Sequence, residues 1–246
     1  MQKIVILGAT SEIAQQTQRI LARNGRQLLL VGRSLERLET VAADLRIRGA
    51  TKVITLGTDL DDLSGHPKVI AFAQEHFADF DGVLLAYGTM HGQEACRHSV
   101  EESLLEWQSN FISAAALLTR FADILETRRC GCLAAITSVA GDRGRGSNYV
   151  YGAAKGALSL FLQGLRARLH ASNVRVLTIK PGPVRTPMTA SLPGSRAFAD
   201  SFDVARDICR ALENGSIDVL YTPWYWRYVM AGIRLIPERV FKKLPI

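Results

Sequence analysis

Cysteine and histidine are scarce in this sequence, and neither is arranged to hold a metal ion. Only four cysteines and five histidines occur among 246 residues. Cys130 and Cys132 border an apolar run, the other two cysteines are isolated, and no histidine cluster accompanies them. Because metal sites place their ligands at short, fixed spacings, the sequence predicts no metal site and no disulfide, but buried thiols. We expect surface or packing roles for all histidines, including His91 and His98.

The sequence also lacks internal repeats, low-complexity tracts and linkers. Its 246 residues, 48% of them hydrophobic, therefore predict one domain. The first strand-like run begins at Lys3 and leaves no room for a signal peptide, so we expect a cytoplasmic protein. The net charge of +7 would suit nucleic acid. No basic helix or aromatic platform for single strands accompanies it, so no nucleic-acid partner is expected.

Short apolar runs alternate with segments of helical length along the chain. The runs lie at 3–7, 27–31, 52–56, 82–87, 132–138, 173–179 and 217–221. The helical segments lie at 11–24, 34–48, 66–79, 99–128, 149–170 and 202–213. This alternation predicts an α/β fold, a single doubly wound Rossmann-type domain with a parallel, seven-stranded sheet. We expect residues 1–220 to form the main domain, 221–246 to extend it, and 182–200 to form a loop.

Tyr151 and Lys155 are four residues apart in a predicted helix, so they lie one turn apart on the same face. A phenol with its ordinary pKa of about 10 is a poor acid or base at neutral pH. A neighbouring ammonium stabilises the phenolate and draws that pKa toward the working range. Ser138, at the end of an apolar run, would hold a substrate carbonyl oxygen. A Tyr and a Lys at this spacing also occur on solvated helix faces, so the companion residues decide between the two interpretations.

The first apolar run ends in Gly8 and leads into a helical segment. Such a turn offers backbone N–H groups to a pyrophosphate. Glu12 and Ala14 stand where a dinucleotide-binding turn usually carries its second and third glycines. The pattern is therefore incomplete, and an ordinary strand-to-helix turn is the alternative. A carboxylate at position 12 would repel phosphate unless it turns away or is paired.

The second apolar run ends in Gly32, Arg33 and Ser34, and these residues bear on the choice of cofactor. An NAD-preferring site places a carboxylate here to bind the ribose 2′-OH. A guanidinium instead suits a 2′-phosphate in charge and geometry, and Ser34 adds a hydroxyl while starting the next helix. The sequence therefore favours NADP(H), and the alternative is that Arg33 only solvates a strand end.

Together these residues resemble the short-chain dehydrogenase/reductase family, over about residues 3–190. The family's catalytic Asn, Ser, Tyr and Lys fall on Asn110, Ser138, Tyr151 and Lys155. Of the family's usual Asn-Asn-Ala-Gly motif after the fourth strand, only the glycine is kept. The resemblance implies cofactor contacts from Gly8, Thr10, Ser11, Ile13, Gly32, Arg33, Ser34, Asp59, Leu60, Ala86, Tyr87, Gly88, Tyr151, Lys155, Pro181, Gly182, Val184 and Thr186.

The resemblance further implies hydride transfer between a nicotinamide and a carbonyl or secondary alcohol. Tyr151 would give the proton in reduction, and Lys155 would lower its pKa and bind the nicotinamide ribose. Ser138 would orient the oxygen, Asn110 would hold a water that links Lys155 to solvent, and Thr186 would meet the carboxamide. The protein would supply positioning and electrostatics.

Other classes of protein remain open. A soluble ketone or 3-oxoacyl reductase would share the same residues. An extended-type epimerase or dehydratase also uses the Tyr–Lys pair, but needs a longer C-terminal substrate domain than the chain has after Pro181. A non-catalytic NADP-binding protein would have little reason to keep the four catalytic residues together.

The segment 221–246 is aromatic and basic. It holds two of the three tryptophans and five cations against one acid. If residues 224–236 are helical, Arg227 and Arg234 lie nearly on one line and leave a broad apolar face. The segment is too short and too charged to span a membrane, but suits peripheral contact with lipid through 223–246. Closing the pocket or packing on a second subunit are the alternatives.

The tail, together with the segment 140–149, resembles the branch of the family that contains decaprenylphosphoryl-2-keto-ribose reductase. That resemblance implies a lipid-linked carbonyl substrate, a keto sugar on a polyprenyl phosphate, reached at the inner face of the membrane; a small-molecule carbonyl is the alternative. The family resemblance also implies a homodimer or homotetramer built on 99–128 and 149–170. The second of these helices carries small residues that permit close approach: Ala153, Ala154, Ala157, Gly164 and Ala167.

Overall fold

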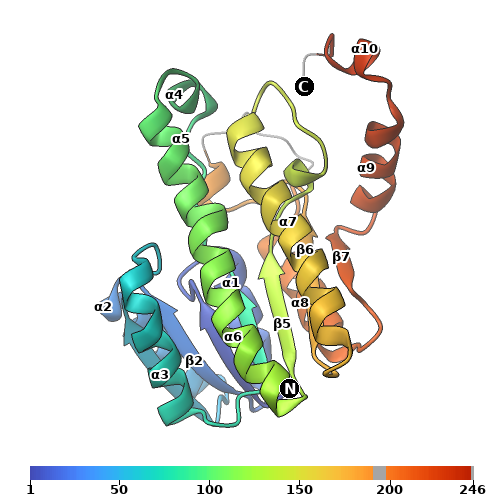
Figure 1. Cartoon of the computed structure of the whole chain (residues 1–246). Coiled ribbons are helices and arrows are strands. Elements are labelled where there is room, and N and C mark those ends of the chain that lie inside the picture. Colours follow the sequence, from blue (N-terminus) through green and yellow to red (C-terminus); the bar gives the residue numbers. More distant parts are fainter. Residues whose placement is uncertain (191–197, 245–246) are drawn as a thin grey trace.

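The computed structural model describes residues 1–190 and 198–244. Within them, seven parallel strands form one sheet in the order β3-β2-β1-β4-β5-β6-β7 (Figure 1). The strands are β1 (Lys3–Leu7), β2 (Gln27–Gly32), β3 (Lys52–Gly57), β4 (Gly82–Leu85), β5 (Cys132–Ile136), β6 (Arg175–Pro181) and β7 (Val219–Thr222). The order reverses between β1 and β4, as in doubly wound sheets. The predicted fold class is confirmed.

Helices cover both faces of the sheet and bury it from each side. α3 (His66–His76), α6 (Ala114–Arg128) and α7 (Tyr149–His170) lie on one face (Figure 1). The opposite face carries α1 (Glu12–Arg23), α2 (Leu35–Ile47) and α8 (Ser201–Glu213). The strands read as continuous apolar runs because both of their faces are buried. In β1, for example, Val5 and Leu7 pack toward one helical layer while Ile4 and Ile6 pack toward the other.

The helical segment predicted over 99–128 is present, but it is not α-helical throughout. α5 (Val100–Trp107) passes into a π-helical turn, η2 (Gln108–Ser113), before α6 begins. A short helix that was not predicted, α4 (Gln93–His98), precedes it. Its six residues are mostly polar, so no apolar periodicity marks it. Single π-helical turns inside α-helices often occur at functional sites.

Two further predictions, the start of β6 and the burial of Cys130, differ from the structure at turns where a residue has a positive φ. β6 begins two residues later than predicted, since Asn173 has a φ of 55° and ends the preceding turn. Gly131 has a φ of 117° where the chain turns into β5. Cys130 immediately before it is exposed, contrary to the expectation of a buried thiol, whereas Cys96, Cys132 and Cys209 are buried.

Short helices complete the C-terminal region and the loops. The predicted tail helix forms as α9 (Trp226–Leu235), followed by α10 (Glu238–Phe241). β7 crosses the predicted boundary at residue 220, and the division of the chain there stays a prediction. Of the predicted loop 182–200, residues 191–197 lie outside the described residues, and η4 (Pro187–Thr189) is the helical turn before them. In the part of the chain that the structure describes, no helix is long and apolar enough to cross a membrane.

Candidate active site

A cavity of about 720 Å³ lies where the strands end at their carboxyl side. This size is ordinary for a small-molecule or cofactor site, and the position is the usual one in open α/β sheets. Every residue predicted for catalysis or cofactor binding lines this cavity except Ser34. Ser34 instead caps α2, where its Oγ accepts a hydrogen bond of 3.3 Å from the Arg37 backbone N–H. The structure thus brings together nearly all the residues that the sequence predicted.

The turn after β1 requires glycine at its first position. Gly8 has a φ of 81°, and a Cβ there would lie 2.7 Å from the backbone nitrogen of Tyr87. Ser11 caps α1 by accepting a hydrogen bond from the Ala14 N–H. The N-terminal turn of α1, with its unpaired N–H groups, therefore faces the cavity, a geometry suited to an anion.

The Glu12 carboxylate at this turn has two hydrogen-bond partners. Its Oε1 accepts hydrogen bonds from Gln16 Nε2 at 2.9 Å and from Ser201 Oγ at 3.3 Å. These two partners turn one of its oxygens toward α8. Both partners are neutral and Glu12 itself lines the cavity, so its carboxylate is hydrogen-bonded but its charge is not neutralised.

Arginines mark the cavity end nearest β2. Arg33 is exposed and lines the cavity, and Arg37, from the first turn of α2, lines it as well. Arg37 was not predicted, although its position one turn into the helix after Ser34 could have indicated it. Asp61 also lines this end, and burial raises the pKa of its carboxyl. The end of the cavity thus offers two guanidinium groups to an anionic ligand.

Ser138, Tyr151 and Lys155 meet at the other end, between β5 and α7. Ser138 follows β5, and its Oγ accepts a hydrogen bond of 3.0 Å from the Ala140 N–H. Tyr151 and Lys155 lie one turn apart on α7, and Lys155 Nζ is 5.8 Å from the centre of the Tyr151 ring. The same Nζ donates to the carbonyl oxygen of Ile136 at 3.4 Å.

Burial controls the protonation of this pair. It raises the pKa of Tyr151 to about 12, while the neighbouring Ser138 hydroxyl acts in the opposite direction. It also lowers the pKa of Lys155 to about 8, against the opposing effect of the Glu106 carboxylate. The expected lowering of the Tyr151 pKa by Lys155 is not found, because desolvation is the largest cause and raises this pKa. At neutral pH the phenol carries its proton, as a proton donor must.

Asn110 lies in the π-helical turn, and its amide is fixed by four contacts. Nδ2 donates to the Thr89 carbonyl oxygen at 3.0 Å and to Glu106 Oε1 at 2.9 Å, and also lies near Thr89 Oγ1 and the Glu106 carbonyl oxygen. The buried Oδ1 has no hydrogen-bond partner among the described residues. A Cβ added to Gly88 would clash with this Oδ1 and lie 3.0 Å from Lys155 Nζ. The Asn110 oxygen and the Lys155 ammonium therefore face the same small space.

Sequence reasoning missed several residues of the cavity. Arg145 and Asn148, from the loop before α7, line it together with Gln93 of α4. Arg145 Nε, Asn148 Oδ1 and Gln93 Nε2 are buried without a hydrogen-bond partner among the described residues. Burial lowers the pKa of Arg145. Buried polar atoms without a hydrogen-bond partner suit a polar or anionic ligand that would bond to them.

His91 and Glu106 also belong to the site. His91 lines the cavity, and its Nδ1 lies 2.6 Å from a Glu102 oxygen. Glu106 is fully buried directly behind Asn110. Nothing in its sequence context distinguishes it from a solvated helix acid. Within residues 1–190 and 198–244, no group of three His, Cys, Asp or Glu side chains is arranged to hold a metal ion.

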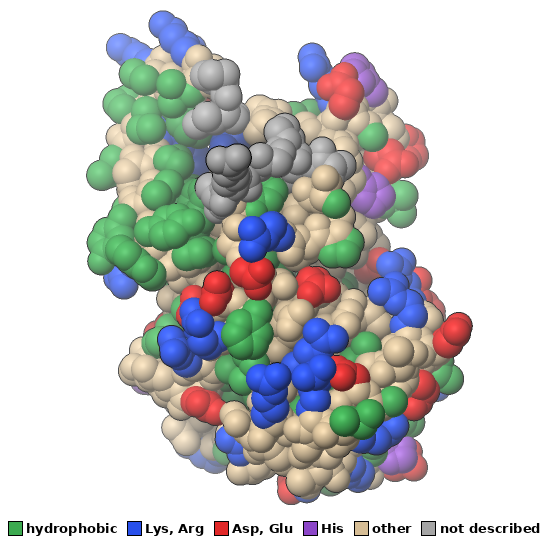
Figure 2. All heavy atoms as spheres, turned by 180° about the vertical axis from the view of Figure 1, so that it is seen from behind, with side chains coloured by type: hydrophobic (Ala, Val, Ile, Leu, Met, Phe, Trp, Pro, Cys, Tyr) green, Lys and Arg blue, Asp and Glu red, His purple; other side chains and the backbone are tan. Residues whose placement is uncertain are grey.

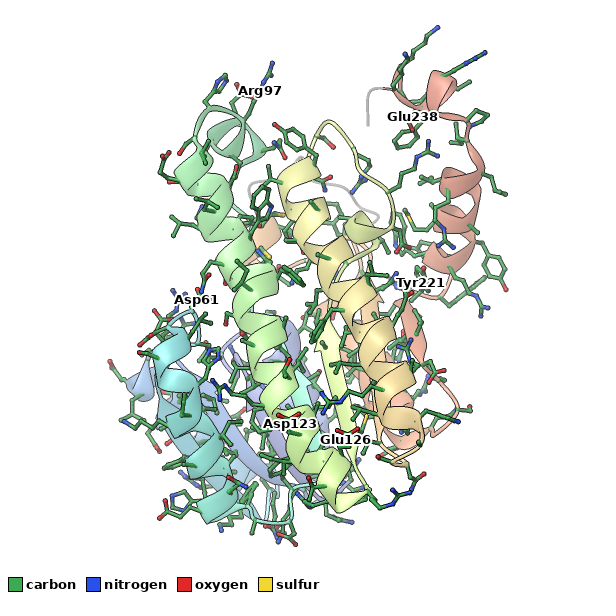
Figure 3. The ribbon with its side chains drawn as sticks, viewed as in Figure 1. Asp61, Arg97, Asp123, Glu126, Tyr221 and Glu238 are labelled. Atoms are coloured by element: carbon green, nitrogen blue, oxygen red, sulfur yellow. The ribbon has the colours of Figure 1, made fainter. Side chains whose placement is uncertain are left out.

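The tail reaches the site through Trp226. Its indole lies directly against Gly182, the residue that follows β6 in the cavity lining. Tyr221 on β7 donates a hydrogen bond of 2.7 Å to Asp142, whose other oxygen pairs with the buried Lys180. Figure 3 shows Tyr221 near the start of the tail and Glu238 near its far end. The tail is thus packed on the edge of the candidate active site.

Comparisons of the sequence agree with this geometry. A family model described as short chain dehydrogenase matches residues 2–196. An uncharacterized oxidoreductase of Mycobacterium tuberculosis is 33% identical over 242 residues, which are 98% of this chain and 96% of the relative. An uncharacterized oxidoreductase of Streptomyces coelicolor is 30% identical over 248 residues, covering 100% of this chain and 96% of the relative.

Solved structures resemble the fold over nearly its whole length. A short chain dehydrogenase from Burkholderia cenocepacia in complex with NADP superposes with a TM-score of 0.82 at 20% identity, covering 96% of this chain and 95% of that one. A short-chain dehydrogenase from Sphingobium yanoikuyae in complex with NADPH gives a TM-score of 0.83 at 22% identity, covering 95% and 93%. At these identities the matches show the fold.

Proposed function

The chain belongs to the short-chain dehydrogenase family, and from that membership and the geometry of its cavity we propose that it reduces a carbonyl compound with NADPH. The observation that carries the proposal is the meeting of Ser138, Tyr151 and Lys155 in one cavity. The phenol and the ammonium lie side by side there, with a serine hydroxyl beside the phenol. This is an arrangement for giving a proton to a carbonyl oxygen.

The residues at the far end of the cavity fit NADPH. The turn at Gly8 and the N-terminus of α1 would hold the pyrophosphate, and Arg33 and Arg37 would hold the 2′-phosphate. Solved structures of two proteins with this fold contain NADP and NADPH. When bound, NADPH supplies the hydride that reduces the carbonyl carbon.

The chain's own residues supply the proton. The Ser138 hydroxyl, which accepts from Ala140 and lies beside the phenol, would donate its hydrogen to the substrate oxygen. Tyr151, protonated at neutral pH, passes its proton to that oxygen as the carbon is reduced, and the product is an alcohol. The charge of Lys155 stabilises the phenolate that remains until it regains a proton from solvent.

We propose a keto sugar on a lipid carrier as the substrate, as in the branch that contains decaprenylphosphoryl-2-keto-ribose reductase. The unpaired atoms of Arg145, Asn148 and Gln93 support a polar, anionic substrate. The tail supports a lipid carrier, because Trp224 and Tyr228 are 71% and 67% exposed. Figure 2 shows hydrophobic side chains gathered over this part of the molecule, with Lys and Arg at its upper end. Such a surface suits a cytoplasmic enzyme that rests on an anionic membrane.

Oxidation of NADPH, followed at 340 nm, tests the proposal. The wild type is offered soluble ketones, 3-oxoacyl thioesters and a keto sugar on a polyprenyl phosphate. We expect turnover with NADPH, fastest with the lipid-linked keto sugar. Tyr151→Phe should bind NADPH like the wild type but reduce the substrate on the order of 10²–10⁴ times more slowly. Full turnover by this variant would remove Tyr151 from the mechanism, and fastest turnover of a soluble ketone would identify a different substrate class.

A further inference from the structure

Glu106 is a buried acid beside the candidate active site. It lies on α5 and its side chain is 0% exposed. Taking a carboxylate out of water costs free energy unless hydrogen bonds or charges compensate for the lost hydration. The surroundings of Glu106 provide this compensation, and they lead directly to Asn110.

Both oxygens of Glu106 accept hydrogen bonds. Oε2 accepts from the Thr89 hydroxyl at 2.9 Å and from the His91 backbone N–H at 3.0 Å. Oε1 accepts from Asn110 Nδ2 at 2.9 Å. Two oxygens that both face N–H donors are the pattern of an ionised carboxylate. An amide at this position would turn its own NH₂ group toward one of those donors.

The hydrogen bond to Asn110 decides which way the Asn110 amide points. With Nδ2 held by Glu106 and by the Thr89 carbonyl oxygen, Oδ1 must face the space shared with Lys155. If the amide were reversed, its oxygen would face the Glu106 carboxylate and its NH₂ group would face the Lys155 ammonium. Both contacts would then be unfavourable. The charge of Glu106 thus keeps an acceptor beside the ammonium.

The groups that face Glu106 come from several elements. His91 lies in the loop after β4, with its Nε2 3.9 Å from Glu106 Oε2, and its other ring nitrogen contacts Glu102. Cys96 of α4 lies close enough for the Glu106 charge to raise its pKa. Tyr151 and Lys155 of α7 also experience this charge, which acts to raise the pKa of each. Lys155 is therefore the cation on the substrate side of Glu106.

We propose that Glu106 is a positioning residue for the reduction: it holds the Asn110 oxygen toward Lys155 and keeps the Lys155 ammonium charged. The proposal rests on the proposed function, since the charged ammonium matters to the reaction only where Tyr151 gives a proton. Two electrostatic effects act together. The negative charge favours the protonated amine, and the oriented Asn110 oxygen offers it an acceptor.

A titration of Lys155 in the cofactor-free protein tests the first effect without any catalysis. In protein with ¹³C-labelled lysine, the Lys155 side-chain signal is assigned by its loss in Lys155→Met. It should titrate at about pH 8 in the wild type. In Glu106→Gln it should titrate at a lower pH, because the carboxylate charge favours the protonated amine. Glu94→Gln removes a charge from a 77% exposed side chain on α4 and should leave the titration unchanged. An unchanged Lys155 titration in Glu106→Gln would overturn the proposal.

Kinetics test the second effect. Glu106→Gln should lower kcat at least tenfold, while the Kd for NADPH stays within about twofold. In its pH profile, the fall of kcat on the alkaline side should begin at a lower pH than in the wild type. Glu106→Asp keeps the charge but is one methylene too short to reach Asn110 and His91 together. Its kcat should be reduced but should fall at the same alkaline pH as in the wild type. A wild-type kcat in Glu106→Asp would count against the proposal, even if Glu106→Gln fails to fold. Absence of turnover in the wild type would instead contradict the proposed function, and the Lys155 titration would still decide the role of Glu106.

Discussion

Arg143 donates a hydrogen bond of 2.7 Å to the carbonyl oxygen of Ile236, 93 residues further along the chain. Its guanidinium also pairs with Glu238 at 3.0 Å and lies 3.7 Å from the centre of the Phe241 ring. Because Arg143 directly follows the helical turn that begins after Ser138, one side chain connects the end of that turn to the end of α9. The C-terminal helices are therefore tied to the site by specific contacts.

Membrane contact through the tail predicts binding to anionic vesicles. The full-length protein should sediment with vesicles containing phosphatidylglycerol at low salt and dissociate at high salt, since each arginine near the headgroups contributes about 1 kcal/mol. Trp224→Ser with Tyr228→Ser should abolish sedimentation without lowering thermal stability, because both side chains are exposed. A chain ending at Thr222, where β7 ends, should stay in solution. Loss of ketone turnover in the double variant, with no vesicle binding by the wild type, would mean that these aromatics close a pocket or an interface.

Lys155→Met should stabilise the cofactor-free protein while abolishing its reductase activity. Burial lowers the pKa of Lys155 to about 8. Between that pH and the ordinary lysine value, the unfolded chain binds more protons than the native protein, so this group's contribution to stability rises with pH and is least favourable below pH 8. At pH 7 the buried charge costs on the order of 3 kcal/mol.

Methionine removes that cost, so the melting temperature at pH 7 should rise by several degrees. Lys68→Met, at an exposed position of α3, should leave it unchanged. A melting temperature of Lys155→Met at or below the wild-type value would show that the buried ammonium is compensated by its surroundings.

Arg33→Ala should weaken NADPH binding far more than NADH binding. A hydrogen bond between a guanidinium and a phosphate contributes roughly 1.5–3 kcal/mol, so the Kd for NADPH should rise by at least tenfold. Arg37→Ala should have an effect of the same sign, because Arg37 lines the same end of the cavity. Arg23→Ala, at an exposed site on α1 outside the lining, is the matched control. Fluorescence titration with each cofactor measures the difference, and equal wild-type affinity for both would contradict the assignment.

A homodimer or homotetramer should form through the layer of α5, α6 and α7. Large apolar side chains are exposed there, among them Leu105 at 55% and Leu160 at 68%. Leu160→Asp should therefore release a monomer in light scattering at micromolar concentration, since burying an unpaired carboxylate in an apolar interface is unfavourable. Ile47→Asp, at an 87% exposed position on α2, should keep the wild-type mass. A monomeric wild type would refute the proposed assembly.

The sheet and the Tyr–Lys pair could be predicted from the sequence because their signals are local. Each strand of a parallel sheet is buried on both faces and reads as a short apolar run, and Tyr151 and Lys155 are placed by helical spacing alone. The π-helical turn at Asn110 could not be predicted in this way. It is a shift in hydrogen bonding within a continuous helical segment, and composition does not record such a shift.

Glu106 and Arg143 escaped prediction for a different reason. Each has the sequence context of an ordinary surface charge, and each is defined by partners distant in the chain. For Glu106 the partners include Thr89 and His91, which reach it only when the loop after β4 folds over α5. For Arg143 they lie at the far end of α9. Burial of such charges is a property of the tertiary structure.

The contact between Gly182 and Trp226 means that a larger residue at 182 requires a smaller one at 226. A side chain at position 182 would occupy the space that the indole fills, so even alanine there clashes with the tail as it is docked. A smaller residue at 226 would make room for it. Relatives that lack a large aromatic residue at 226 are therefore free to carry a bulkier residue after β6, and their cavity entrance would be reshaped with it. Variation of substrate preference across the family would then follow the pairing of these two positions, and a library designed to alter preference would vary them jointly.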